Sequence, residues 1–204
     1  MATSPVFEQT YRRYLDQIGA IEHLARAGRL GAGIDGEALV IPLYERIYKV
    51  SAARIEALDG GRVTDAVRVI LARYVLNCPQ RPAQAPDPWV SYREFKDAAP
   101  LVFYFKANTN KTLENHFGGR LGLLKQRCRD LGGVEEPHQS YDLSVRFSAL
   151  PKVPVMLNFN DRDDLFPPAC SVLYRKSAES YLDMECLAMT GTLLCGKLLR
   201  ADST

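Results

Sequence analysis

The stretch LSVRFSALPKVPVMLNF, residues 143–159, decides the fold class. Apolar side chains alternate along both of its arms, and a short turn containing Pro151 and Lys152 separates the arms. The alternating apolar positions are Leu143, Val145, Phe147 and Ala149 before the turn and Val153, Val155, Leu157 and Phe159 after it. A period of two places these side chains on one face of a sheet. The sequence therefore predicts an antiparallel hairpin over 143–159 with one buried face.

The segments around the hairpin show helical or strand-like patterns in blocks. Residues 7–28 and 180–199 repeat apolar side chains at helical spacing. Residues 37–58 are rich in β-branched and aromatic residues, which favours a pair of strands. The other expected elements are a helix capped by Thr64, short helices over 109–119 and 120–133, and a third sheet strand over 170–175. We expect an α+β fold, with an antiparallel sheet packed by an N-terminal helix, short middle helices and a long C-terminal helix.

The length of the chain suits one domain. It has 204 residues, and four prolines between Pro79 and Pro88 predict a stiff, extended loop near the middle. We expect a single domain over residues 1–204. An N-terminal half (1–78) and a C-terminal half (89–204) would be joined by the loop at 79–88.

Composition narrows the class of protein. Hydrophobic residues make up 47% and the formal net charge is only +2, which is typical of a globular protein and does not favour nucleic-acid binding. No apolar run is long enough to span a membrane. Five cysteines without a C-x-x-C pair indicate reduced thiols and a cytoplasmic protein. We expect Cys128, Cys186 and Cys195 in the core, and Cys78 and Cys170 in more exposed positions.

Four aspartates form a candidate metal site: Asp142, Asp161, Asp163 and Asp164. Asp142 precedes the first hairpin strand and the others follow the second, so antiparallel pairing brings these ends of the strands together. Carboxylates are ligands that Mg²⁺ and Ca²⁺ prefer, and a divalent cation is the one cofactor that the sequence suggests. The alternative is a polar turn, in which the aspartates accept hydrogen bonds from nearby amides and Arg162 balances one charge.

Four other residues are candidate ligand-binding residues: Arg93, Glu94, His116 and Arg120. If residues 89–95 form a strand, Arg93 and Glu94 point to opposite faces, and Arg93 can hold a carboxylate in a bidentate pair. His116 and Arg120 flank a glycine pair at an expected helix start, where free amides attract anions. The alternatives are a structural arginine–aspartate clamp and a solvated basic helix face.

Several of these motifs, taken in order, resemble a known family. They are WVSYREF at 89–95, LGG at 131–133, ALPKVPVMLNFNDRDDLFPPACSVLY at 149–174 and SYLDMECLA at 180–188. They are similar to the domain of unknown function 3786 family, uncharacterised bacterial and archaeal proteins found mostly in anaerobes. The resemblance implies no activity, since none is established for the family. The joining of some members to iron–sulfur domains suggests a redox or corrinoid context.

The motifs of this chain depart from the family's pattern in two respects. Tyr92 stands where phenylalanine is usual, and Phe159 stands where tryptophan is common. The clustered cysteines of an iron–sulfur site are missing from this sequence. The resemblance and the residue-by-residue reading both single out the acidic loop after the hairpin.

Three function classes fit these features. The first is a cytoplasmic small-ligand-binding or accessory protein, whose pocket forms where the acidic loop meets residues 91–94. The second is a metal-assisted hydrolase that uses the aspartates of residues 161–164. The third is a protein–protein interaction module. Whether the chain is an enzyme, and whether it forms a homo-oligomer, is left open by the sequence.

Overall fold

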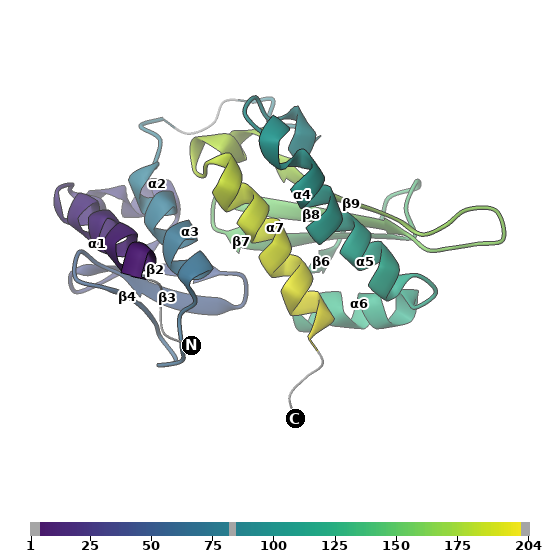
Figure 1. The fold of residues 1–204 in the computed structure, drawn as a ribbon, viewed down its shortest axis with the longest axis horizontal. Coiled ribbons are helices and arrows are strands. Elements are labelled where there is room, and N and C mark those ends of the chain that lie inside the picture. Colours follow the sequence, from purple (N-terminus) through teal and green to yellow (C-terminus); the bar gives the residue numbers. More distant parts are fainter. Residues whose placement is uncertain (1–4, 82–84, 201–204) are drawn as a thin grey trace.

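The computed structural model describes residues 5–81 and 85–200, and its architecture is α+β, as predicted (Figure 1). We expected one antiparallel sheet, and the described residues form two. Their strand orders are β1-β2-β3-β4 and β5-β9-β8-β7-β6. The strand pair expected within 37–58 belongs to the first of these sheets, which has four strands. Within the described residues, no helix combines the length and the apolarity needed to cross a membrane.

The N-terminal half contains the four-stranded sheet and three helices. The strands are β1 (Gly33–Asp35), β2 (Ala38–Leu43), β3 (Arg46–Val50) and β4 (Ile55–Ala57). The helices are α1 (Pro5–Gly19), α2 (Ala27–Leu30) and α3 (Asp65–Leu76). The Tyr11 hydroxyl accepts a hydrogen bond of 2.8 Å from the Ile55 N–H, which ties α1 to β4. Thr64 caps α3 as predicted, accepting from the Val67 N–H at 3.4 Å.

The helix expected over 7–28 is shorter than predicted. α1 ends at Gly19, and a short 3-10 turn, η1 (His23–Arg26), leads into α2. Glycine has low helix propensity, so a helix ends there readily even though the apolar pattern continues beyond it.

The hairpin of residues 143–159 is confirmed at the centre of the five-stranded sheet. Its arms are β7 (Leu143–Leu150) and β8 (Val153–Asn160). Leu143 pairs with Phe159, and Phe147 pairs with Val155, so the apolar positions of both arms share one face. The remaining strands are β9 (Ala169–Arg175), which is the predicted third strand, and the short edge strands β5 (Trp89–Ser91) and β6 (Val134–Glu135).

Four helices accompany this sheet: α4 (Val102–Asn108), α5 (Asn110–Phe117), α6 (Leu121–Asp130) and α7 (Met184–Leu199). Figure 1 shows α4, α5 and α7 running over the strands β7–β9. α7 approaches its neighbours closely at Gly191. A Cβ atom there would lie 2.6 Å from the Phe105 ring of α4 and 2.8 Å from the Tyr174 hydroxyl of β9. Short 3-10 turns lie at η2 (Tyr92–Glu94), η3 (Ala99–Leu101) and η4 (Lys176–Ser180).

Two expectations about burial are wrong. The first was that only one face of the hairpin is buried. On the opposite face Ser144 and Asn158 are buried as well, and the Ser144 hydroxyl donates to Asn158 Oδ1 at 2.8 Å. Cys78 and Cys170 are buried rather than exposed, at 6% and 9%. A proline close to a cysteine in the sequence therefore does not indicate that the cysteine is exposed. The predicted core position is confirmed for Cys128, Cys186 and Cys195.

Buried tyrosines connect the two halves. The Tyr74 hydroxyl of α3 accepts from the Lys152 N–H in the hairpin turn at 3.1 Å. Tyr44, between β2 and β3, donates its N–H to the Ala149 carbonyl and its hydroxyl to the Thr190 carbonyl, both at 2.8 Å. These contacts agree with a single domain, which stays a prediction until unfolding is measured.

Candidate functional site

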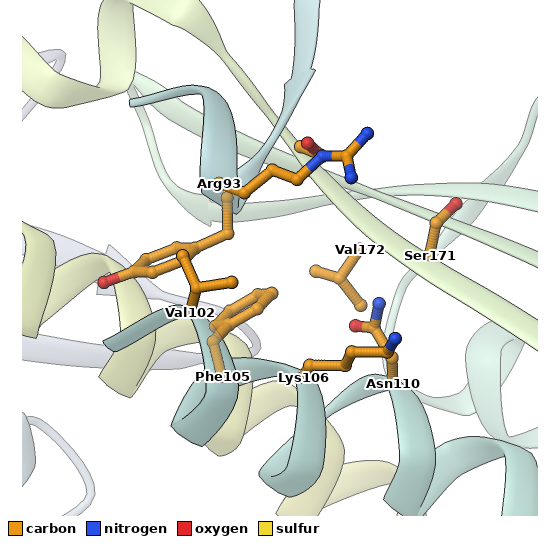
Figure 2. A pocket seen from close by; sticks show the side chains of 9 residues that line it. Arg93, Val102, Phe105, Lys106, Asn110, Ser171 and Val172 are labelled. Carbon is orange, nitrogen blue, oxygen red and sulfur yellow. The ribbon is translucent and has the colours of Figure 1, made fainter. Parts of the chain in front are cut away.

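A cavity of about 230 Å³ lies where β5 ends, between β9 and the helices α4 and α5. Figure 2 shows Arg93 on one side of this space and Lys106 with Asn110 on the opposite side. Ser171 and Val172 of β9 lie between them. The pairing of β5 with β9 brings these segments together, since Ser91 lies opposite Leu173.

The apolar wall of the cavity is built around a stacked aromatic pair. The rings of Tyr92 and Phe105 have centroids 4.4 Å apart and planes inclined by 11°. The Tyr92 hydroxyl donates to the Met184 carbonyl at 2.7 Å, which fixes the ring to α7. Burial raises the pKa of Tyr92 to about 12, so this hydroxyl stays protonated and keeps its role as a donor. Val102 and Val172 complete the apolar wall.

Glu94 holds the end of β5 in place. Its Oε1 accepts from the Ser91 hydroxyl at 2.6 Å and from the Ser91 N–H at 2.7 Å, which forms a capping box. The same two bonds, that of the Ser91 hydroxyl foremost, lower the pKa of the Glu94 carboxyl. We expected Arg93 and Glu94 on opposite faces of a strand, and this is wrong, because residues 92–94 form a 3-10 turn. Arg93 lines the cavity, whereas Glu94 folds back onto Ser91.

Hydrogen-bond donors dominate the polar groups around the cavity. Arg93 and Lys106 are exposed at its rim, and neither takes part in an ion pair within the described residues. The side-chain amide of Asn110 adds two N–H donors to the rim. A guanidinium, an ammonium and an amide on the rim of one space favour a bound anion.

The sequence analysis identified Arg93 but missed the other polar residues of the cavity, Lys106, Asn110 and Ser171. No motif marks them. Ser171, 78 residues from Arg93, reaches it through the pairing of β5 with β9, and Lys106 and Asn110 reach it through the packing of α4 and α5.

The aspartates of the candidate metal site lie at the open end of the hairpin. Asp142 Oδ2 accepts from the Asp161 N–H at 2.8 Å, and Asp161 Oδ1 accepts from the Gly119 N–H at 2.5 Å. Asp163 Oδ1 accepts from the Phe166 N–H at 2.7 Å. The Asp163 bond is typical of the polar turn that we gave as the alternative, whereas the bonds of Asp142 and Asp161 join segments that are distant in the sequence.

The metal hypothesis gains no support from this geometry. Asp142, Asp161 and Asp163 line a hollow of about 660 Å³, and Asp164 does not. Among the described residues, no group of three or more carboxylate, histidine or cysteine side chains is arranged to hold a metal ion. The metal site at these four aspartates stays a prediction.

His116 and Arg120 lie away from both hollows. Neither residue lines the cavity at Arg93 or the hollow at the aspartates. Burial, and then the charge of Arg120, lowers the pKa of His116. The amide expected to attract an anion is occupied within the chain, because the Gly119 N–H already donates to Asp161. The anion-binding role of Arg120 stays a prediction.

Comparison with known proteins assigns the family. The family model described as "Domain of unknown function (DUF3786)" matches residues 22–197. The chain belongs to the DUF3786 family. No curated protein and no solved structure matches it.

The DUF3786 resemblance can now be located in the structure. WVSYREF supplies Ser91, Tyr92 and Arg93 to the cavity. Tyr92, the departure from phenylalanine, uses its hydroxyl to bond α7. Phe159, the departure from tryptophan, is fully buried in the core and contacts no solvent. The acidic loop singled out by the resemblance forms the other hollow, beside α5.

Proposed function

We propose that this DUF3786 chain binds a small organic carboxylate in the cavity between Arg93 and Lys106. One observation carries the proposal. Two cations that have no ion-pair partner among the described residues lie on opposite sides of one space, above a wall of stacked aromatic and valine side chains. A carboxylate would meet the cations at the rim, and the apolar body of the ligand would contact Phe105 and Val172.

The size of the cavity limits the ligand. Its volume of about 230 Å³ is below the roughly 300 Å³ at which drug-sized pockets begin. We therefore expect a compact acid rather than a nucleotide or a long acyl chain. We place this binding or accessory role in the cytoplasm, because the five cysteines are free thiols and such thiols persist in a reducing compartment.

Calorimetry with benzoate and the uncharged, isosteric benzamide tests the proposal. We expect benzoate to bind at least tenfold more tightly, because only the carboxylate forms charge-assisted hydrogen bonds. Arg93→Gln and Lys106→Gln should each weaken benzoate binding. Arg120→Gln, which removes an equal charge outside the cavity, should leave it unchanged. Equal affinity for the two compounds, or a loss confined to Arg120→Gln, would contradict the proposal.

A further inference from the structure

Three cations surround a hollow at the junction of the two halves, which we call the junction hollow. It measures about 240 Å³ and is lined by Gly28, Arg29, Pro79, Arg81, Lys152 and Tyr181. Arg29 belongs to α2, Arg81 follows α3, and Lys152 lies in the turn between β7 and β8. Among the residues that the structure describes, no carboxylate lines the junction hollow.

The packing of the hairpin turn on α2 brings two of the cations together. The Tyr74 hydroxyl donates to the Leu30 carbonyl at 2.6 Å and accepts from the Lys152 N–H at 3.1 Å. A Cβ at Gly31, where α2 ends, would lie 3.5 Å from Lys152 Cε. The stem of Lys152 therefore runs along the end of the helix that carries Arg29.

The third cation is placed by the end of α3. The Arg26 guanidinium donates to the carbonyls of Val75 and Leu76 at 2.9 and 2.8 Å, which holds the end of α3 beside the start of α2. The chain then passes through Pro79 to Arg81, and both residues line the junction hollow. Three segments that are distant in the sequence thus each supply one cation to the same space.

The charges of these side chains are not balanced within the described residues. None of the three takes part in an ion pair there. The Nε of Arg29 is buried and has no hydrogen-bond acceptor in that part of the chain. A buried donor without an acceptor is unfavourable, and like charges repel one another. An anion in the junction hollow would offset the repulsion and accept from the guanidinium of Arg29.

We infer that the junction hollow binds a phosphoryl group, either as inorganic phosphate or as the phosphate of a small ester. The site goes beyond the proposed carboxylate site and shares no lining residue with it. A phosphate monoester carries about 1.5 to 2 negative charges at pH 7 and three strong acceptor oxygens. A carboxylate carries one charge and two oxygens, so three cations match the phosphoryl group better. Tyr181 and Pro79 form the uncharged part of the wall, where the organic part of an ester would lie.

Calorimetry at pH 8 with phenyl phosphate and phenyl sulfate tests the inference on the unmodified protein. The two compounds share a shape, but the sulfate carries a single negative charge. We expect phenyl phosphate to bind at least tenfold more tightly. Inorganic phosphate, titrated separately, identifies the source of the phosphoryl group: tighter binding than phenyl phosphate assigns the site to the free ion, and weaker binding assigns it to an ester. Equal affinities for phenyl phosphate and phenyl sulfate, or no binding of either phosphate compound, would overturn the inference.

Variants of the two exposed cations locate the binding. Arg81→Gln and Lys152→Gln should each weaken phenyl phosphate binding about tenfold, the loss expected for one charge-assisted hydrogen bond. Arg120→Gln removes an exposed charge outside the junction hollow and should leave the affinity unchanged. Saturating benzoate should not displace phenyl phosphate, because the carboxylate site is separate. Displacement by benzoate, or unchanged affinity in both Arg81→Gln and Lys152→Gln, would overturn the inference.

Discussion

At the scale of single residues, Glu94 holds the chain in the turn that ends β5 beside the cavity. It accepts two hydrogen bonds from Ser91, the last residue of β5. It also leaves the guanidinium of Arg93, its neighbour in the chain, free of a carboxylate partner. The sequence predicted a strand in which Glu94 points away from Arg93, and the Glu94 side chain instead caps Ser91, three residues earlier.

Replacing Glu94 tests this role. We expect Glu94→Ala to lower the free energy of unfolding by about 1 kcal/mol, the usual cost of a lost cap, and to weaken benzoate binding. Glu94→Gln keeps an acceptor oxygen, so it should lose less stability and less benzoate affinity than Glu94→Ala. Chemical denaturation and calorimetry measure the two effects. A Glu94→Ala protein that binds benzoate as well as the wild type would show that the cap does not shape the cavity.

The charge of Glu94 adds a dependence on pH. Its folded pKa lies below the ordinary value of 4.5, so its contribution to stability is fully present above that value. The contribution is lost as the pH falls through the folded pKa. The melting temperatures of the wild type and Glu94→Gln should therefore differ at pH 6 and converge toward pH 3. A difference that grows on acidification would contradict the lowered pKa.

At the scale of elements, α7 supports the cavity from behind. Gly191 lets the helix lie against Phe105, whose ring stacks on Tyr92 in the cavity wall. Gly196, five residues later on the same helix, has nothing within 4 Å of the position where a Cβ would be. The two glycines thus share a helix and differ in the space around them.

This difference predicts opposite effects of one substitution. Gly191→Ala forces a methyl group against Phe105 and the Tyr174 hydroxyl, and overpacking of this kind costs about 1–3 kcal/mol. Gly196→Ala should stabilise the helix by up to about 1 kcal/mol, because alanine has the higher helix propensity. Urea denaturation measures both. Equal effects at the two positions would mean that α7 does not pack as tightly on α4 as described.

The elements were more predictable than the site. The hairpin followed from alternation within residues 143–159, which is a local pattern, and the cap at Thr64 is local as well. The cavity depends on Ser91 lying opposite Leu173, and no local pattern specifies that pairing. The aspartates attracted attention because they are close in sequence, yet they bond mostly to nearby amides. Asn110 and Val172 carry no sequence signal for binding.

At the scale of the whole molecule, the two sheets are joined by buried hydrogen bonds. Tyr74 donates its hydroxyl to the Leu30 carbonyl at 2.6 Å and accepts from Lys152, so one side chain bridges both halves. Arg73 adds an ion pair of 2.8 Å with Asp183, the cap of α7. Contacts of this kind couple the stability of the halves.

Tyr74→Phe tests the coupling. The variant leaves the buried Leu30 carbonyl and the partly buried Lys152 N–H without their partner, and we expect a loss of about 1–3 kcal/mol. Tyr104→Phe, at a tyrosine that is 51% exposed, should be nearly neutral. Both proteins should unfold in one transition that is the same by near-UV and far-UV circular dichroism. Two separate transitions in the wild type would contradict a single domain.

The central claim is that an anion binds between Arg93 and Lys106. The most direct measurement is an NMR titration of the isotope-labelled protein with benzoate, following the side-chain N–H signals of Arg93 and Asn110. We predict that these signals shift together and saturate, while those of Arg120 and the loop at 161–166 stay unchanged. Shifts confined to Arg120 or to the acidic loop, or no saturable shift at all, would contradict the claim.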